Sequence, residues 1–142
     1  NPKSLTLDFE KASRIAIAKA DQAHPDCLHS TAGLFGSLGK TGTVVDDTPG
    51  LVVLRTVAML ANEASEAVLN GVATPFDVDR AMTLGVNYPR GPLAWADSIG
   101  AQHVLATLEA IHASYGDDRY RPSRYLRRVV GAGRRLLPGP DL

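Results

Sequence analysis

The sequence has little cysteine, few aromatic residues and no excess of either charge. Cys27 is the single cysteine among 142 residues, which excludes an internal disulfide, and aromatic residues make up only 6%. Fifteen basic and fifteen acidic residues balance, which removes the electrostatic argument for nucleic-acid binding. No apolar run approaches the ~20 residues of a membrane-spanning helix, and no signal peptide is visible. We therefore expect a cytoplasmic protein with no membrane and no nucleic-acid partner.

The balanced charge is unevenly distributed along the chain. From Arg119 onward, seven arginines stand against one aspartate, a formal charge of about +6, which leaves about −6 on the remainder. Such asymmetry is typical of a solvated arginine-rich helix face, and it also fits a basic tail that lies on an acidic neighbour or partner. The first residue is Asn rather than Met, so a native product and a fragment of a longer chain are both open alternatives.

Three glycines at positions 33, 36 and 39 do not form a dinucleotide-binding loop. Such a loop places its glycines between a strand and a helix, where backbone N–H groups meet the pyrophosphate. Here that junction falls at residues 21–25 and contains no glycine, and the three glycines lie inside or after the helix. The sequence therefore predicts that this chain binds no nucleotide cofactor.

Metal ligands and activated nucleophiles are equally scarce. His24, Cys27 and His29 lie close together, but a fourth ligand is lacking and the spacing matches no zinc pattern. No Gly-x-Ser-x-Gly stretch is present. Asp77 and Asp79 fall in the first turn of a predicted helix, where the dipole favours negative charge; a catalytic carboxylate pair is the alternative. We expect no metal site.

Residues 1–48 are predicted to form a small α/β lead-in segment. Leu5, Leu7 and Phe9 alternate with polar residues, as Ile15 and Ile17 do later, which indicates half-buried strands. A helix is expected from residue 24 until Gly39, followed by a strand at 43–45, which together fit one strand–helix–strand crossover unit. Its expected apolar helix face consists of Leu28, Thr31, Leu34, Phe35 and Leu38. Three strands cover little core, so we expect this segment to pack against a structure outside residues 1–48.

Helical segments are predicted from residue 51 onward by apolar residues at three- and four-residue spacing. The segments are residues 51–69, 75–85, a short one at 92–99, 101–115, and one that begins near residue 123. Thr74 is expected to cap the second of these, with Asp77 as the acid of a capping box. Their inward stripes are Val53, Val57, Leu60, Ala61, Ala64 and Val68; Val78, Ala81 and Met82; Val104, Leu105, Leu108, Ile111 and Tyr115; and Tyr125, Leu126, Val129 and Val130, with Asn62 on the polar side. We predict a mainly α fold: a compact bundle of about five helices over residues 49–135, then a loose tail over 136–142.

A set of linked motifs in the helical part resembles the C-terminal domain of the 3-hydroxyacyl-CoA dehydrogenases. The motifs are a Pro-Gly turn, a first-turn Arg, an Asn-Glu-Ala, an Asp-x-Asp-x-Ala-Met-x-Leu-Gly and a Tyr-Pro-x-Gly-Pro; here they begin at Pro49, Arg55, Asn62, Asp77 and Tyr88. The resemblance covers roughly residues 44–133. It implies a bundle like the C-terminal domain of 6-phosphogluconate dehydrogenase. The chain looks most like the second of two such domains in long enzymes that act on 3-hydroxyadipyl-CoA or 3-hydroxybutyryl-CoA.

The resemblance also implies a candidate site and reveals one departure from the family pattern. Substrate-cleft positions by resemblance are Leu54, Arg55, Tyr88 and Pro89. The family has an active-site Asn where this chain has Leu54, and an alkyl side chain cannot make the hydrogen bonds of an amide. We therefore expect no catalytic residue in this chain, and we expect Leu54 to be buried in the helix interface.

Cofactor and partners follow from the same resemblance. In the family, an N-terminal Rossmann domain binds NAD and carries the His and Glu that act as the catalytic base. Residues 1–48 are expected to be a degenerate copy of such a domain that binds no NAD. We expect acyl-CoA to be bound by the full-length parent enzyme. For the assembly, we expect either a homodimer or docking on the first C-terminal copy and the Rossmann domain of that enzyme. Two alternatives are a substrate domain that completes a partner's active site and a non-enzymatic helical interaction module.

Overall fold

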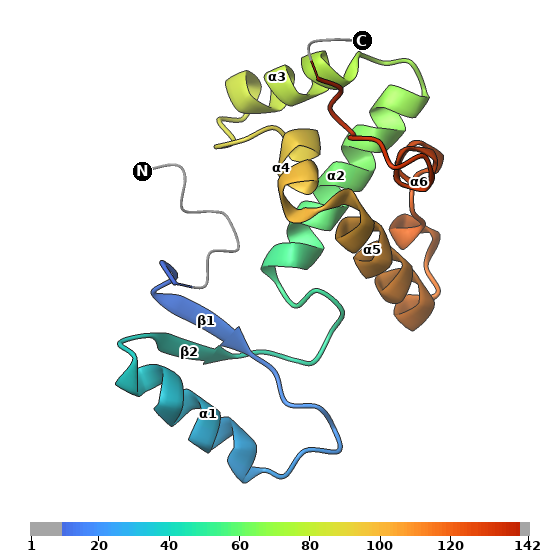
Figure 1. Cartoon of the computed structure of the whole chain (residues 1–142). Helices are drawn as coiled ribbons and strands as arrows, with labels where there is room; N and C mark the ends of the chain where they lie inside the picture. Colours follow the sequence, from blue (N-terminus) through green and yellow to red (C-terminus); the bar gives the residue numbers. More distant parts are fainter. Residues whose placement is uncertain (1–9, 140–142) are drawn as a thin grey trace. The chain divides into compact units, whose positions relative to one another are not determined.

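A computed structural model of the chain describes residues 10–139 (Figure 1). The chain divides into two compact units, Asn1–Val52 and Val53–Leu142, and each is described separately. The strand expected around Leu5–Phe9 lies outside the described residues.

The first unit is a strand–helix–strand crossover, as the sequence predicts. Strand β1 (Arg14–Ile17) and strand β2 (Thr41–Val44) are parallel, with Arg14 opposite Thr41 and Ile17 opposite Val44, and helix α1 (Asp26–Ser37) connects them. Ile17 is the buried apolar residue of this sheet, at 7% exposure. A Cβ on Gly42 would lie only 2.7 Å from Ile17 Cδ1, so glycine at this position leaves room for the isoleucine side chain.

The expected apolar face of α1 is only partly correct. No residue of α1 is buried within the described structure, and Leu34 and Leu38 are 60% and 61% exposed. Two short strands offer too little area to cover a twelve-residue helix. The apolar spacing predicted the helix correctly, but it could not predict whether a second layer covers that face.

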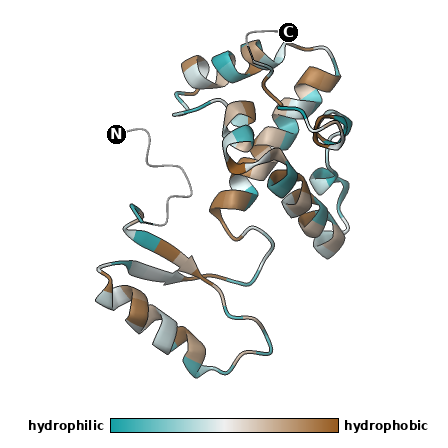
Figure 2. Cartoon of the chain, viewed as in Figure 1, coloured by the Kyte–Doolittle hydropathy of each residue, from teal (hydrophilic) through white to brown (hydrophobic). Residues whose placement is uncertain are grey.

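The second unit is the predicted helical bundle. Its elements are α2 (Val53–Leu69), α3 (Pro75–Gly85), α4 (Pro92–Ile99), α5 (Ala101–Tyr115), the short 3-10 helix η2 (Asp118–Tyr120) and α6 (Arg124–Gly131). Helix α2 contacts α3, α4, α5 and α6, so it is the central helix of the bundle. The core residues are Ala58, Ala61, Ala64, Leu93, Ala96, Ala101, Val104, Leu108, Leu126, Val129 and Leu136. Figure 2 shows hydrophobic and hydrophilic residues along the same helices, as amphipathic packing requires.

The helix cap and the helix-ending glycines predicted from the sequence are confirmed in the bundle. Thr74 Oγ1 accepts the backbone N–H of Asp77 at 3.2 Å and donates to Asp77 Oδ2 at 2.6 Å, which closes the N-terminus of α3. Gly71 follows α2 at φ +70° and Gly116 follows α5 at φ +65°. Both are left-handed conformations that glycine adopts without a Cβ clash.

Some residues of the predicted stripes lie on the wrong face. Val53 and Tyr115 are 49% and 47% exposed, and Ala81 is exposed, although all three were expected to face inward. Asn62 was expected on the polar side of α2 but is 2% exposed. Because α2 is packed by helices on several sides, a polar residue at this position also faces the interior.

Asn62 satisfies its buried amide by binding the chain just before α6. Its Nδ2 donates to the carbonyl of Arg121 at 3.0 Å, and its Oδ1 accepts the N–H of Ser123 at 2.8 Å. A buried amide with both ends bonded stabilises one arrangement of two segments that are far apart in sequence. Asn62 therefore positions the start of α6 against the central helix.

Candidate functional site

The Arg55 side chain joins three elements at one end of the bundle. Arg55 lies in the first turn of α2, and its Nη1 and Nη2 donate to the hydroxyls of Tyr115 at 3.0 Å and Tyr120 at 2.8 Å. Its guanidinium carbon also lies 4.9 and 5.2 Å from the centroids of these two rings, within cation–π range. The rings contact each other at 5.1 Å between centroids. We call Arg55, Tyr115 and Tyr120 the Arg55 cluster.

The electrostatics of the Arg55 cluster come from the phenols. The hydrogen bond to Tyr115 is the largest influence and raises the pKa of Arg55, with smaller contributions from both tyrosines. Burial acts in the opposite direction, and no acidic residue is among the groups that raise this pKa. Arg55, which is always charged at ordinary pH, thus has hydroxyl groups rather than a carboxylate as its side-chain partners.

Leu54, beside Arg55 in the chain, is only partly buried. The expectation that its side chain would be buried in the helix interface is therefore too strong, because the first turn of α2 has intermediate exposure at this position. The chemical consequence of a leucine is unchanged. No hydrogen-bond donor or acceptor is available from this side chain.

Tyr88 and Pro89 lie on a different element from the Arg55 cluster. They follow α3, after Asn87 at φ +57°, and the Tyr88 N–H donates to the carbonyl of Met82 at 3.3 Å. Tyr88 is half-buried and Pro89 is exposed. Within the part of the chain that the structure describes, no hydrogen bond, ion pair or ring contact joins either residue to Arg55. The four predicted positions thus form two separate groups.

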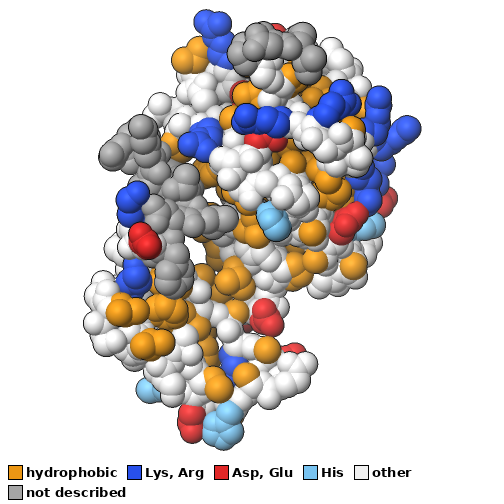
Figure 3. Space-filling model, viewed as in Figure 1, with side chains coloured by type: hydrophobic (Ala, Val, Ile, Leu, Met, Phe, Trp, Pro, Cys, Tyr) orange, Lys and Arg blue, Asp and Glu red, His pale blue; other side chains and the backbone are white. Residues whose placement is uncertain are grey.

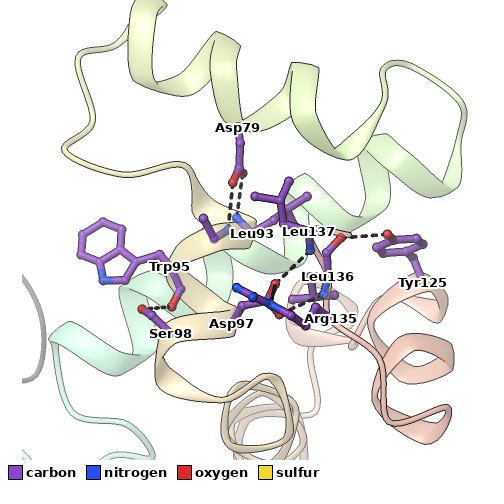
Figure 4. A network of polar contacts seen from close by, with 10 residues as sticks. Asp79, Leu93, Trp95, Asp97, Ser98, Tyr125, Arg135, Leu136 and Leu137 are labelled. Carbon is purple, nitrogen blue, oxygen red and sulfur yellow. Dashed lines mark hydrogen bonds and ion pairs between the residues drawn. The ribbon is translucent and has the colours of Figure 1, made fainter. Parts of the chain in front are cut away.

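A buried carboxylate on α3 fixes the start of α4 (Figure 4). Asp79, on α3, accepts the N–H of Leu93 on Oδ1 and the N–H of Ala94 on Oδ2, both at 2.8 Å. The N–H groups in the first turn of a helix have no carbonyl partner within that helix. The carboxylate supplies the partner at the start of α4, and its charge is also favoured by the positive end of the helix dipole. A Cβ on Gly91 would overlap the Asp79 carboxyl group, so glycine permits this close approach.

A second carboxylate, Asp97 on α4, binds the C-terminal segment. Its two oxygens accept the N–H groups of Leu136 and Leu137, each at 2.9 Å, and Arg135 Nε lies 3.6 Å from Oδ2. Tyr125 donates its hydroxyl to the carbonyl of Leu136 at 3.0 Å (Figure 4). Leu136 is fully buried, so the expectation of a loose segment from residue 136 is wrong at its start.

Burial shifts the acidity of two groups in this network. Desolvation raises the pKa of the Asp79 carboxyl, the two backbone N–H groups oppose that shift, and the charge of Asp97 adds to it. Desolvation likewise raises the pKa of Tyr125, against the opposing charge of Arg134. Both groups are engaged with backbone atoms, so the network serves to hold α3, α4 and the C-terminal segment together. The sequence placed Asp79 in the first turn of its own helix, where the dipole favours an acid; its carboxylate instead binds the first turn of α4.

Exposed arginines gather around α6, and the candidate metal ligands His24, Cys27 and His29 are exposed as well. Figure 3 shows Lys and Arg side chains gathered in the region of α6, where Arg124, Arg127 and Arg128 are exposed; Arg127 pairs with Glu109 at 2.6 Å. Among residues 10–139, no group of three or more His, Cys, Asp or Glu side chains could hold a metal ion. None of the helices in that range combines the length and apolarity needed to cross a membrane.

Two consecutive family descriptions match the two units of the chain. The description "3-hydroxybutyryl-CoA dehydrogenase reduced Rossmann-fold domain" matches residues 5–49, and "3-hydroxyacyl-CoA dehydrogenase, C-terminal domain" matches residues 50–136. The lead-in is therefore a shortened Rossmann-type unit, as the sequence suggested, and the bundle is the helical domain that follows it. The chain belongs to the 3-hydroxyacyl-CoA dehydrogenase C-terminal domain family.

Individual relatives agree with that membership. The chain is 43% identical over 118 residues to a 3-hydroxyadipyl-CoA dehydrogenase of Escherichia coli, covering 82% of this chain and 25% of that protein. It is 48% identical over 96 residues to a probable 3-hydroxybutyryl-CoA dehydrogenase of Deinococcus radiodurans, covering 68% of this chain and 34% of the relative. The chain thus spans about a quarter to a third of the length of these relatives.

Solved structures share the fold. A crystal structure of (S)-3-hydroxybutyryl-CoA dehydrogenase from Ralstonia eutropha matches with a TM-score of 0.79 at 34% identity, over 87% of this chain and 44% of that one. The 3-hydroxybutyryl-CoA dehydrogenase structure from Escherichia coli matches with a TM-score of 0.76 at 41% identity, over 85% of this chain and 26% of that one.

Proposed function

We propose that this chain is a structural, substrate-side domain of an NAD-dependent 3-hydroxyacyl-CoA dehydrogenase of fatty-acid or phenylacetate catabolism. In this role the helical bundle covers the acyl-CoA cleft and supplies a subunit contact, while a separate nucleotide-binding domain holds NAD. The relatives support the choice of reaction, since they are a dehydrogenase of 3-hydroxyadipyl-CoA and a probable dehydrogenase of 3-hydroxybutyryl-CoA. Because this chain covers only part of each relative, the reaction itself belongs to the longer protein.

The observation that carries the structural role is Leu54. Oxidising a 3-hydroxyacyl thioester requires a base for the hydroxyl proton and hydrogen-bond donors for the carbonyl as it forms. The side chain in the first turn of α2 at the family's amide position is leucine, which supplies neither. The neighbouring Arg55 donates two of its N–H groups to Tyr115 and Tyr120, and a permanently charged guanidinium is no base for the hydroxyl proton.

The shortened lead-in unit supports the separate location of NAD. Between β1 and α1 the chain passes through residues 18–25, which contain no glycine. A pyrophosphate at a helix N-terminus needs close backbone approach, and glycines usually provide it. The first unit therefore lacks the sequence feature that binds a dinucleotide.

A second candidate is a substrate domain that completes the active site of a partner's Rossmann domain. The retained Tyr88-Pro89-Arg90-Gly91-Pro92 segment favours it, because Gly91 is fitted closely against Asp79 and the segment is thereby held in one conformation. In that case the catalytic donors at position 54 would have to come from the partner.

The test is an assay of the isolated chain. NADH formation would be followed with 3-hydroxybutyryl-CoA and with 3-hydroxyadipyl-CoA at high protein concentration, and NAD binding would be measured by calorimetry. Circular dichroism would check the helical fold, and the Escherichia coli 3-hydroxyadipyl-CoA dehydrogenase would serve as the positive control. We expect neither NADH above a no-protein blank nor NAD binding; turnover by the chain alone would contradict the structural role.

A further inference from the structure

We propose that the Arg55 cluster is a binding site for the carboxylate group of a small molecule. Arg55 is half-buried, and it takes part in no ion pair with any Asp or Glu of residues 10–139. Its neighbours are instead two neutral phenols, so no acid of the described chain offsets the positive charge of the guanidinium.

The two tyrosines add hydrogen-bond donors beside this charge. Each phenolic oxygen accepts an N–H from Arg55, at 3.0 Å for Tyr115 and 2.8 Å for Tyr120. An oxygen that accepts from a guanidinium keeps its own O–H proton for another acceptor. No hydrogen bond donated by either hydroxyl is found within the described part of the chain. Two O–H donors therefore flank one cation, with no acceptor assigned to them.

The guanidinium also retains donors of its own. Arginine carries five N–H groups in a planar fork, and two of them reach the tyrosine hydroxyls. The ring centroids lie 4.9 and 5.2 Å from the guanidinium carbon, so the aromatic surfaces restrict approach to part of the fork. An incoming planar group would meet the remaining N–H groups and the adjacent hydroxyls.

One charge and neutral donors favour a carboxylate over a phosphate. A carboxylate carries one negative charge on two acceptor oxygens, which matches a single guanidinium with flanking O–H groups. A phosphate monoester carries ≈ −1.5 to −2 charges at neutral pH and usually collects several cations. Arg119 places a second guanidinium carbon 6.0 Å from the Tyr120 ring centroid, and Asp117 and Asp118 lie immediately before it in the chain. These two acids offset the charge of Arg119, which further disfavours a dianion.

The cluster is accessible to a ligand within its own unit. Tyr115 is 47% exposed, and Arg55 and Tyr120 are half-buried. The first turn of α2, the last turn of α5 and η2 supply one residue each. Three separate elements thus bring a cation and two hydroxyl groups together on a surface that a small carboxylate can reach.

The experiment is calorimetric titration of the 142-residue chain with sodium adipate, sodium acetate and inorganic phosphate at constant ionic strength. Tyr115→Phe with Tyr120→Phe removes both hydroxyls and keeps both rings. Ser98→Ala, which removes an exposed hydroxyl on α4 that donates to the carbonyl of Trp95, is the control away from the cluster. We expect saturable one-to-one binding of the carboxylates, weakened at least about tenfold in the double variant and unchanged in Ser98→Ala. Circular dichroism and melting curves would confirm that each variant is folded.

Three results would overturn the site. They are an absence of saturable carboxylate binding by the folded wild-type chain, an equal loss in Ser98→Ala, and tighter binding of phosphate than of either carboxylate. Adipate that binds more tightly than acetate would still support the site and would identify a longer dicarboxylate as the better ligand. The measurement uses no NAD, acyl-CoA or turnover, so its outcome is independent of the proposed dehydrogenase role.

Discussion

Asp79 is a buried carboxylate whose partners are two backbone N–H groups rather than a cation. At 7% exposure it has lost most of its hydration, and its bonds to Leu93 and Ala94 replace that hydration only in part, because its pKa is raised from the ordinary 3.8. A raised acid pKa means that the folded chain favours the protonated form. This residue therefore links the packing of α3 on α4 to pH.

We expect Asp79→Asn to change both stability and its pH dependence. The amide would present N–H₂ to one of the two backbone N–H groups, and the unsatisfied donor should lower the free energy of unfolding by about 1–3 kcal/mol at low pH. Above the unfolded pKa the folded chain binds more protons at this site than the unfolded chain. The stabilisation from Asp79 is therefore complete below about pH 4 and is lost as pH rises through the folded pKa.

Urea unfolding of wild type and Asp79→Asn across this acidic range would check the prediction. The difference in free energy of unfolding, wild type minus variant, should shrink as pH rises from about 4 and become constant beyond the folded pKa. A difference that grows with pH would mean that the folded state favours the ionised carboxylate, contrary to the direction inferred from burial.

At the residue scale, what could be predicted from sequence depended on distance along the chain. Thr74 capping Asp77 was predicted correctly, because the two residues are neighbours in one turn. The partners of Asp79 and Asp97 lie 14 and up to 40 residues away, and no local pattern names them. Leu54 and Arg55 were found only through the family resemblance, and the tyrosine partners of Arg55 are 60 and 65 residues distant.

Among the elements, the C-terminal segment is more firmly attached than its composition indicates. Proline and glycine at residues 138–140 suggested a loose tail, but Leu136 is fully buried in the main core. Asp97 binds the N–H of Leu136, and Tyr125 binds its carbonyl. A short irregular segment can be well ordered when its backbone polar groups find partners.

Leu136→Ala tests whether this segment supports the bundle. Removing a fully buried leucine side chain should cost about 2–5 kcal/mol in free energy of unfolding. Leu137→Ala is the matched control, because Leu137 is half-buried and its N–H also binds Asp97. This substitution should cost clearly less. Chemical unfolding of both variants gives the comparison; equal small losses would show that the segment adds little to the core.

The helices and the crossover unit were predictable for a physical reason that did not extend to every face. Apolar periodicity and turn residues are local, so α5 was predicted at its observed bounds, Ala101–Tyr115. Which side of a helix is covered depends on neighbouring elements, and the sequence placed Val53, Ala81 and Tyr115 inside when they are exposed. For Asn62 the error was the reverse: the sequence placed it on the polar side, but it is buried because α2 is packed on several sides.

At the scale of the whole molecule, both units expose apolar side chains that a larger assembly could cover. Much of α2 is unavailable for such a contact, because Val57, Ala58 and Ala61 are buried within the bundle. Exposed apolar residues instead include Phe76 and Leu84 on α3, at 51% and 74% exposure. Contiguous exposed apolar patches mark partner surfaces, and we predict that Phe76 and Leu84 take part in the subunit contact of the proposed role.

The most direct test of that contact role is the mass of the chain in solution. Light scattering after size exclusion should give twice the 15.1 kDa of one chain, in a closed two-fold pair. Phe76→Asp with Leu84→Asp should shift the mass to one chain, whereas Arg124→Gln, an exposed change on α6, should leave the pair intact. A mass of 15.1 kDa for the wild-type chain throughout about a hundredfold range of concentration would contradict the account.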